Sequence, residues 1–141
     1  MRKVIIPILI VIFFYGCFSS IHEGNVEVGR VLSKAVVGKI DSQEFLLIET
    51  RNGSLNIVDT SLYWLTNNID SNLIVNENIE KELLKKYQEI KYVADVRLCI
   101  HEKNIKYTLD RNNFNILAVN LTIKFQLNGD DRSKIEKLLE H

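Results

Sequence analysis

The chain has 141 residues, with 18 basic and 18 acidic side chains and therefore a formal net charge of +0. This balance excludes the strongly basic surface typical of nucleic-acid binding, so we expect no nucleic-acid partner. Two cysteines are too few for a disulfide-stapled scaffold, so a hydrophobic core has to hold the chain together as one domain of ordinary size.

The first segment of the chain has the pattern of a signal peptide. Arg2 and Lys3 form a basic start, and an apolar run follows from Val4 to Tyr15. That run is well short of the ~20 residues that a membrane-spanning helix needs, and its length is typical of a signal-peptide hydrophobic region. We therefore expect residues 1–16 to be a signal peptide and the rest of the chain to lie outside the cytoplasm.

Gly16-Cys17 closes this segment with a small residue directly before a cysteine. The junction resembles the lipobox of bacterial lipoprotein precursors, in which cleavage occurs before a cysteine that receives the lipid. Phe14 and Tyr15 are bulkier than the residues usual there, as in relaxed lipoboxes of the spirochaete type. The resemblance implies a lipoprotein of the cell envelope, attached to a membrane by fatty-acyl chains such as palmitate on Cys17, with residues 17–25 as a tether. An uncleaved membrane anchor and an ordinary secretory signal are the alternatives, and both also place the domain outside the cytoplasm.

Residues 26–141 follow as a single domain that begins with strand patterns. Apolar alternation predicts strands over 26–32 and 35–40, with Gly29 as a candidate bulge. Asn52-Gly53 lies between two apolar runs and predicts a hairpin, because both residues accept the positive φ that a tight turn requires. A small barrel is one arrangement of this antiparallel β-rich part.

The middle of the chain contains the clearest helix pattern. Before it, residues 60–68 form either a helical turn capped by Asp59 or Thr60 or a covering loop, and residues 73–75 form a short strand. Asn76 then caps an amphipathic helix that we expect to reach residue 90 or 91. Its apolar stripe repeats at spacings of four, four and three and consists of Ile79, Leu83, Tyr87 and Ile90.

The last third of the chain is predicted to be an antiparallel β-meander followed by a short helix. Strand patterns cover residues 92–101, 105–109 and 114–127, each with one apolar and one mostly polar face. Ser133 and Glu136 have the spacing of a capping box, which predicts a terminal helix that must dock on the sheet. The expected fold class is therefore α+β, with sheet and helices packed as layers.

Four chemically interesting side chains alternate along the strand expected at 92–101, namely Asp95, Arg97, Cys99 and His101. Strand geometry places them on one face, where Cys99 and His101 could form a thiol nucleophile with its base, or part of a metal site. Zinc needs three or four ligands, and the sequence has no second Cys/His cluster. The other interpretation is a solvated strand face with an Asp95–Arg97 pair and a half-buried thiol.

The charges around the predicted hairpin are a second group that catalysis could use. Glu49, Arg51 and Asp59 could act as carboxylates or clamps, but charges beside a hairpin usually serve solubility. The sequence contains no glycine-rich phosphate loop, dinucleotide fingerprint or nucleophile-elbow spacing. We therefore expect no cofactor, no metal and no catalytic activity.

Part of the second half resembles a known family. The segments Val96-Arg97-Leu98, Tyr107 to Asn113 and Leu117 to Gln126 are similar to a stretch of band-7 (stomatin/prohibitin-like) domains. In that family a strand precedes a Thr-x-Asp turn and a long alternating strand. The resemblance implies a membrane scaffold. It does not extend to residues 77–92, which are expected to be helical here, or to the family's long C-terminal helix.

Three functional hypotheses follow from these patterns. The first is a lipid-anchored extracytoplasmic binding or structural module that acts through contacts with a protein partner. The second is a small thiol- or metal-dependent enzyme that uses Cys99 and His101. The third is a membrane scaffold of the band-7 type. The first fits best, because the leader is the most specific signal in the chain and the domain lacks a recognisable catalytic motif.

Overall fold

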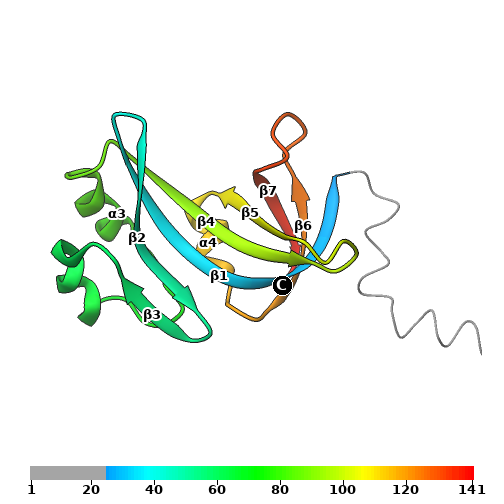
Figure 1. Cartoon of the computed structure of the whole chain (residues 1–141), viewed down its shortest axis with the longest axis horizontal. Coiled ribbons are helices and arrows are strands. Elements are labelled where there is room, and N and C mark those ends of the chain that lie inside the picture. The colour runs from blue at the N-terminus through cyan, green and yellow to red at the C-terminus, as the bar shows by residue number, and fades with distance from the viewer. Residues whose placement is uncertain (1–24) are drawn as a thin grey trace, which may run out of the picture.

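The computed structural model describes residues 25–141, which form one antiparallel sheet of seven strands with three short helices (Figure 1). The fold class is α+β, as predicted. The strands are β1 (Val26–Ile40), β2 (Gln43–Arg51), β3 (Ser54–Ile57), β4 (Glu89–Leu98), β5 (Asn104–Leu109), β6 (Thr122–Leu127) and β7 (Ile135–Glu140). The helices are the 3₁₀ helix η1 (Thr60–Asn67), α3 (Glu77–Leu84) and α4 (Arg111–Ile116).

Strand β1 is the spine of the sheet. It runs for 15 residues and pairs with β4 along one edge, and with β6 and then β2 along the other. The two strands predicted for this region are therefore one strand. The chain bends at register shifts between Val31 and Ser33 and between Val36 and Val37. Gly29 is not the bulge: a Cβ there would come within 2.5 Å of the Val96 side chain, so the glycine permits close packing of β1 on β4.

The sheet is not closed into a barrel. Its path runs β3-β2-β1-β4-β5, with the β6–β7 hairpin attached to the first residues of β1. Within residues 25–141, β5 and β7 are linked through one isolated bridge between Thr108 and Lys134. The small barrel considered for the N-terminal part does not form, because β1 and β2 pair with each other and with strands from later in the chain.

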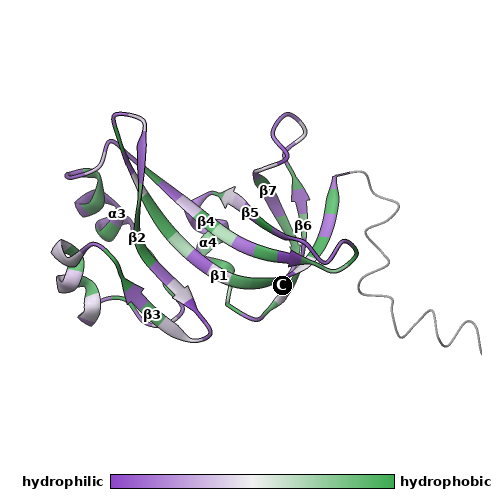
Figure 2. Ribbon diagram, in the orientation of Figure 1, coloured by the Kyte–Doolittle hydropathy of each residue, from purple (hydrophilic) through white to green (hydrophobic). Residues whose placement is uncertain are grey.

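One face of the central strands is buried and the other is open. On β1 and β4, Lys34, Val36, Tyr92 and Ala94 are at most 5% exposed. Tyr92 contacts both helices on that face, through a hydrogen bond to Glu80 of α3 and a ring contact with Phe114 of α4. Figure 2 shows hydrophobic and hydrophilic residues alternating along β1 and β4, which is the pattern of a sheet with one core face.

The hairpin and the first helical turn confirm the sequence predictions. Asn52 and Gly53 have φ values of 53° and 75°, and β2 and β3 pair directly across them. Asp59 caps η1 by accepting a hydrogen bond from the Ser61 backbone nitrogen. Both features depend on chemistry within a few residues.

Among the described residues, no helix is long and apolar enough to cross a membrane.

The prediction that this helix reaches residue 90 or 91 is wrong. Asn76 caps α3 as expected, but the helix stops at Leu84. The buried Tyr87 packs over Gly38 of β1, and the Gln88 backbone nitrogen donates to the Lys39 carbonyl. The chain therefore pairs with β1 instead of forming the last predicted turn of the helix, and Ile90 becomes a residue of β4.

The strand predicted at 73–75 is also wrong. This segment belongs to a loop that crosses the core face of the sheet, with Leu73 fully buried at a φ of +53°. The Asn115 side chain accepts a hydrogen bond from the Val75 backbone nitrogen and donates one to the Val75 carbonyl. A side chain from α4 therefore satisfies backbone groups that a strand would have paired in a ladder.

The three-stranded meander and the terminal helix do not form. The β4–β5 hairpin is present, but Asp110 caps α4 where a turn and a long strand were expected. Strand β6 therefore begins at Thr122, and it pairs with β1 and β7 instead of β5. The terminal segment is strand β7, because six residues gain more from a ladder with β6 than from a helix too short to be stable.

Candidate functional site

The open face of the sheet carries a shallow trough of about 470 Å³. Its floor consists of short side chains from three adjacent strands: Ser33, Ala35 and Val37 of β1, Val93 of β4 and Thr108 of β5. Small residues at facing positions leave space that larger ones would fill. We call this surface the open-face trough.

Strand register brings the floor together. Ala35 of β1 lies opposite Glu49 of β2 on one side and Val93 of β4 on the other. Val93 in turn lies opposite Thr108 of β5. These four residues form one cross-strand row, so the trough is built on paired strands and not on mobile loops.

An ion pair closes one end of the trough. Arg51 of β2 reaches across β1 to Asp95 of β4, with 3.2 Å between Nη2 and Oδ2. The same nitrogen donates a hydrogen bond to Ser33 Oγ at 3.2 Å, and Nε lies 3.4 Å from Glu49 Oε1. Arg51 therefore connects three strands through its guanidinium group.

A second ion pair closes the other end in the same manner. Lys91 of β4 reaches across β1 to Glu44 of β2, with 2.6 Å between Nζ and Oε1. The hydrogen bond from Lys91 lowers the pKa of the Glu44 carboxyl below its usual value. Because Ser33 and Val37 are four residues apart on β1, the two bridges are separated by roughly 13 Å along the strand.

The trough therefore carries charges of both signs at defined places. Its three carboxylates belong to Glu44, Glu49 and Asp95. Its three cationic groups belong to Lys91, to Arg51 at the rim, and to Lys106, which lies opposite Asp95 on β5. An occupant that presents both hydrogen-bond donors and acceptors, or charges of both signs, fits this pattern better than one with a single strong charge.

The structure separates the four residues that the sequence suggested as a site. Asp95 and Arg97 lie on the open face of β4, but Asp95 pairs with Arg51, and Arg97 donates to Asn104 Oδ1 at 3.4 Å. Strand β4 ends at Leu98, so Cys99 and His101 fall in the β4–β5 turn and not on the strand face. The predicted alternation through residue 101 is therefore wrong.

Cys99 and His101 have different surroundings in that turn. Cys99 is half-buried, and its backbone nitrogen donates to the Val28 carbonyl. His101 is exposed and lines a separate cavity of about 280 Å³ together with Tyr107 and Arg132. Burial raises the pKa of Tyr107 to about 12, and nearby Glu27 adds to that shift. Within residues 25–141, no three His, Cys, Asp or Glu side chains come close enough to hold a metal ion.

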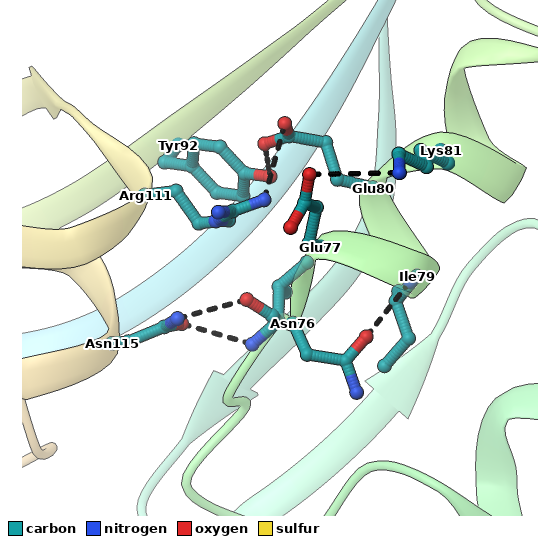
Figure 3. A network of polar contacts seen from close by, with 9 residues as sticks. Asn76, Glu77, Ile79, Glu80, Lys81, Tyr92, Arg111 and Asn115 are labelled. Carbon is teal, nitrogen blue, oxygen red and sulfur yellow. Dashed lines mark hydrogen bonds and ion pairs between the residues drawn. The ribbon is translucent and has the colours of Figure 1, made fainter.

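Polar contacts on the buried face fix β4 beneath the trough (Figure 3). The Tyr92 hydroxyl donates to Glu80 Oε2 at 2.5 Å, and Arg111 Nη1 lies 3.3 Å from Glu80 Oε1. Burial of the ring and the hydrogen bond to Glu80 both raise the pKa of Tyr92. The network joins α3, β4 and α4, so it holds the strand that supplies Val93 and Asp95 to the trough.

Sequence reasoning missed most of the trough. Glu44, Lys91 and Ser33 gave no signal of their own, and Glu49 and Arg51 were interpreted as solubilising charges. The two residues of each ion pair are far apart in the sequence, by 44 positions for Arg51–Asp95 and by 47 for Lys91–Glu44. Only the pairing of β2 and β4 with β1 brings them together. The anchor candidate Cys17 lies outside the described residues.

No family model, curated protein or solved structure matches the chain.

Proposed function

We propose that the protein is a lipid-anchored extracytoplasmic binding module that acts through contacts with a protein partner. The observation that carries the binding role is the open-face trough, where two ion pairs frame a floor of short side chains on a rigid sheet. Cys17 is the lipidated residue, and residues 18–25 are the tether. The domain then works close to the membrane and needs no catalytic group.

The charges of the trough favour a protein segment as its occupant. Arg51 and Lys91 are each paired within the chain and remain partly exposed, so a partner can add hydrogen bonds to them without breaking either ion pair. Ser33 and Thr108 add hydroxyl groups that can donate or accept hydrogen bonds. Backbone amides and polar side chains of a partner segment match this mixture of groups.

The anchor is tested by mass spectrometry of the mature N-terminus in the membrane fraction. The expected result is a chain that begins at an acylated Cys17, and release of the Cys17→Ser variant from that fraction. An unmodified Cys17 inside an intact leader would refute lipid anchoring. This experiment tests the anchor alone and leaves the role of the trough to a second one.

The trough is tested by site-specific photo-crosslinking in cells that produce the protein. A photoreactive phenylalanine analogue at Val93 should give discrete adducts, whereas the same analogue at the exposed Lys137 of β7 should not. The Ala35→Trp substitution, which fills the floor, should abolish the Val93 adducts. Equal crosslinking at both positions, or adducts that persist after the Ala35→Trp substitution, would rule out the trough as the recognition surface.

A further inference from the structure

A second hollow lies at the end of the sheet that carries the β1–β2 turn. It has a volume of about 400 Å³ and is mostly apolar. Its walls come from the end of β1, from β2, from the residues after β3 and from the segment after α3, and include Ile40, Phe45, Leu46, Val58, Lys86 and Tyr87. We call it the distal cleft, because Figure 1 places the β1–β2 turn and the start of β1 at opposite ends of the molecule.

The walls of the distal cleft are held by a polar cluster. Asp59 accepts hydrogen bonds from the Tyr87 hydroxyl, from Lys86 Nζ at 2.8 Å and from the Ser61 hydroxyl at 2.7 Å. Tyr87 is buried and packs over Gly38. The cleft is therefore formed before any partner arrives, which lowers the entropic cost of binding.

The backbone beside the cleft is open. Strand β3 pairs with residues 48–51 of β2, whereas residues 43–46 pair with β1 on their inner edge. Within residues 25–141, no strand pairs with the outer edge of residues 43–46. An open strand edge next to an apolar groove is the geometry in which an extended segment adds to a sheet and places a side chain in the groove.

Three of the exposed large apolar side chains line this cleft. Ten large apolar side chains are exposed among the described residues, and seven of them lie between residues 45 and 84. Phe45, Leu46 and Val58 at the cleft are 42%, 41% and 45% exposed. Tyr63 and Trp64 on η1, the helix that Asp59 caps, are also exposed. Aromatic side chains that are held rigidly and left exposed are frequent anchors of protein interfaces.

The length of the tether decides what can occupy the cleft. Strand β1 runs up to about 46 Å from its start to Ile40 at the cleft. The eight residues 18–25 span at most about 29 Å when fully extended. If Cys17 is anchored as proposed, the tether cannot reach the cleft, and the open backbone edge beside the cleft can pair with a peptide but not with lipid acyl chains. Its occupant then comes from another molecule.

We propose that the distal cleft binds an extended apolar segment of a partner protein, which adds as a strand to residues 43–46 of β2. One apolar side chain of that segment enters the cleft between Phe45 and Val58. The exclusion of the tether rests on the anchor proposed above, whereas the open strand edge is observed independently of that anchor. The cleft shares Leu46 with the open-face trough, but its other lining residues differ, so substitutions at Val58 and at Val93 test the two proposals separately.

The test uses the full-length protein in detergent micelles and a phage-displayed library of random ten-residue peptides. Peptides with alternating apolar residues should be enriched, and the bound peptide should slow amide hydrogen exchange at residues 43–46. Val58→Glu should weaken their binding at least tenfold. Ile100→Glu is the matched control, because Ile100 is 41% exposed in the β4–β5 turn and should leave binding unchanged. Melting temperatures confirm that both variants fold.

Four results would overturn the proposal, and the last of them would move the peptides to the trough. The first is a library that yields no peptide that prefers the wild-type protein over the Val58→Glu variant. The second is binding that leaves the amides of residues 43–46 unprotected. The third is self-association, seen by light scattering, that Val58→Glu abolishes, because a second copy would then be the occupant. Loss of peptide binding in a Val93→Glu variant would instead assign the peptides to the trough.

Discussion

Lys34 and Thr50 lie opposite each other on β1 and β2 and hold the same loop, whose Leu73 is buried beside them. Lys34 Nζ donates to the carbonyl of Asn72 at 2.8 Å, and Thr50 Oγ1 donates to the carbonyl of Ser71 at 2.6 Å. Lys34 is fully buried, and it also donates to the Leu117 carbonyl and lies 4.4 Å from the centre of the Phe114 ring. Two polar side chains on neighbouring strands thus donate hydrogen bonds to loop carbonyls, as a paired strand would do through its backbone.

Thr50→Val tests this arrangement at nearly constant volume. The substitution removes the hydroxyl and leaves the Ser71 carbonyl without its donor, so the free energy of unfolding should fall by about 1–3 kcal/mol. Chemical denaturation measures the change. Thr122→Val, at an exposed position of β6, should cost less than about 0.5 kcal/mol. Equal effects of the two substitutions would show that the Thr50 hydroxyl does not stabilise the loop.

Lys34 should make stability rise with pH in the mildly alkaline range. Burial lowers the pKa of Lys34 from 10.5 to about 8, and the nearby charge of Asp70 opposes that shift. Between pH 8 and pH 9 the unfolded chain then binds more protons than the folded one, so the free energy of unfolding increases with pH by up to about 1.4 kcal/mol per pH unit. Urea unfolding at several pH values measures the slope.

Lys34→Met supplies the control for this slope, because methionine has no proton to lose. Its stability should be nearly independent of pH from 8 to 9, whatever its absolute value, because the tyrosines of the unfolded chain lose few protons below pH 9. Above pH 10 the wild-type trend should reverse, because burial raises the pKa of Tyr107 to about 12 and the unfolded chain loses its tyrosine protons first. A wild-type slope no steeper than that of the variant would mean that Lys34 keeps an ordinary pKa.

Local chemistry could be predicted from the sequence, and long-range pairing could not. The Asn52-Gly53 turn and the caps at Asp59 and Asn76 depend on neighbours within three residues, and the structure confirms them. Ile90 fits both the helical stripe and a strand, and only the contact between Gln88 and Lys39 of β1 decides between them.

The errors at the end of the chain have the same cause. The alternation from Leu117 to Leu127 fits a long strand, but the Leu117 carbonyl accepts a hydrogen bond from Lys34 of β1 and the strand begins only at Thr122. The terminal segment has the capping-box spacing of a helix but is too short for a stable one, and β6 supplies the ladder that makes it a strand. The trough depends on pairings of the same kind, so its bridges were not visible to sequence patterns.

Gly38 should tolerate no side chain. A Cβ at this position would lie 2.5 Å from Tyr87 Cδ1 and 3.0 Å from Leu47 Cδ1. Gly38→Ala should therefore displace the buried Tyr87 ring and lower the free energy of unfolding by about 1–3 kcal/mol. Gly129→Ala is the control, because no atom lies within 4 Å of its added Cβ. Similar melting temperatures for the two variants would contradict close packing at Gly38.

Asp59 should contribute stability that acid removes. Burial raises the pKa of its carboxyl, but hydrogen bonds from Lys86, Tyr87 and Ser61 outweigh burial and hold that pKa well below its usual range. The contribution is therefore present above the unfolded pKa of about 4 and is lost as pH falls through and below it. Asp59→Asn should lower the melting temperature at pH 7 and flatten its dependence on pH below 4. A variant with the same acid dependence as the wild type would exclude this role.

The Arg51–Asp95 bridge should matter more for binding than for stability. Arg51 is nearly half exposed, so water screens the pair, and a double-mutant cycle with Arg51→Met and Asp95→Asn should give a coupling energy below about 1 kcal/mol. Either substitution should nevertheless reduce crosslinking from position 93, because Arg51 no longer closes that end of the trough. The Lys81–Glu77 pair on α3, which is remote from the trough, is the matched control. A coupling energy of several kcal/mol with unchanged crosslinking would make the bridge a structural feature only.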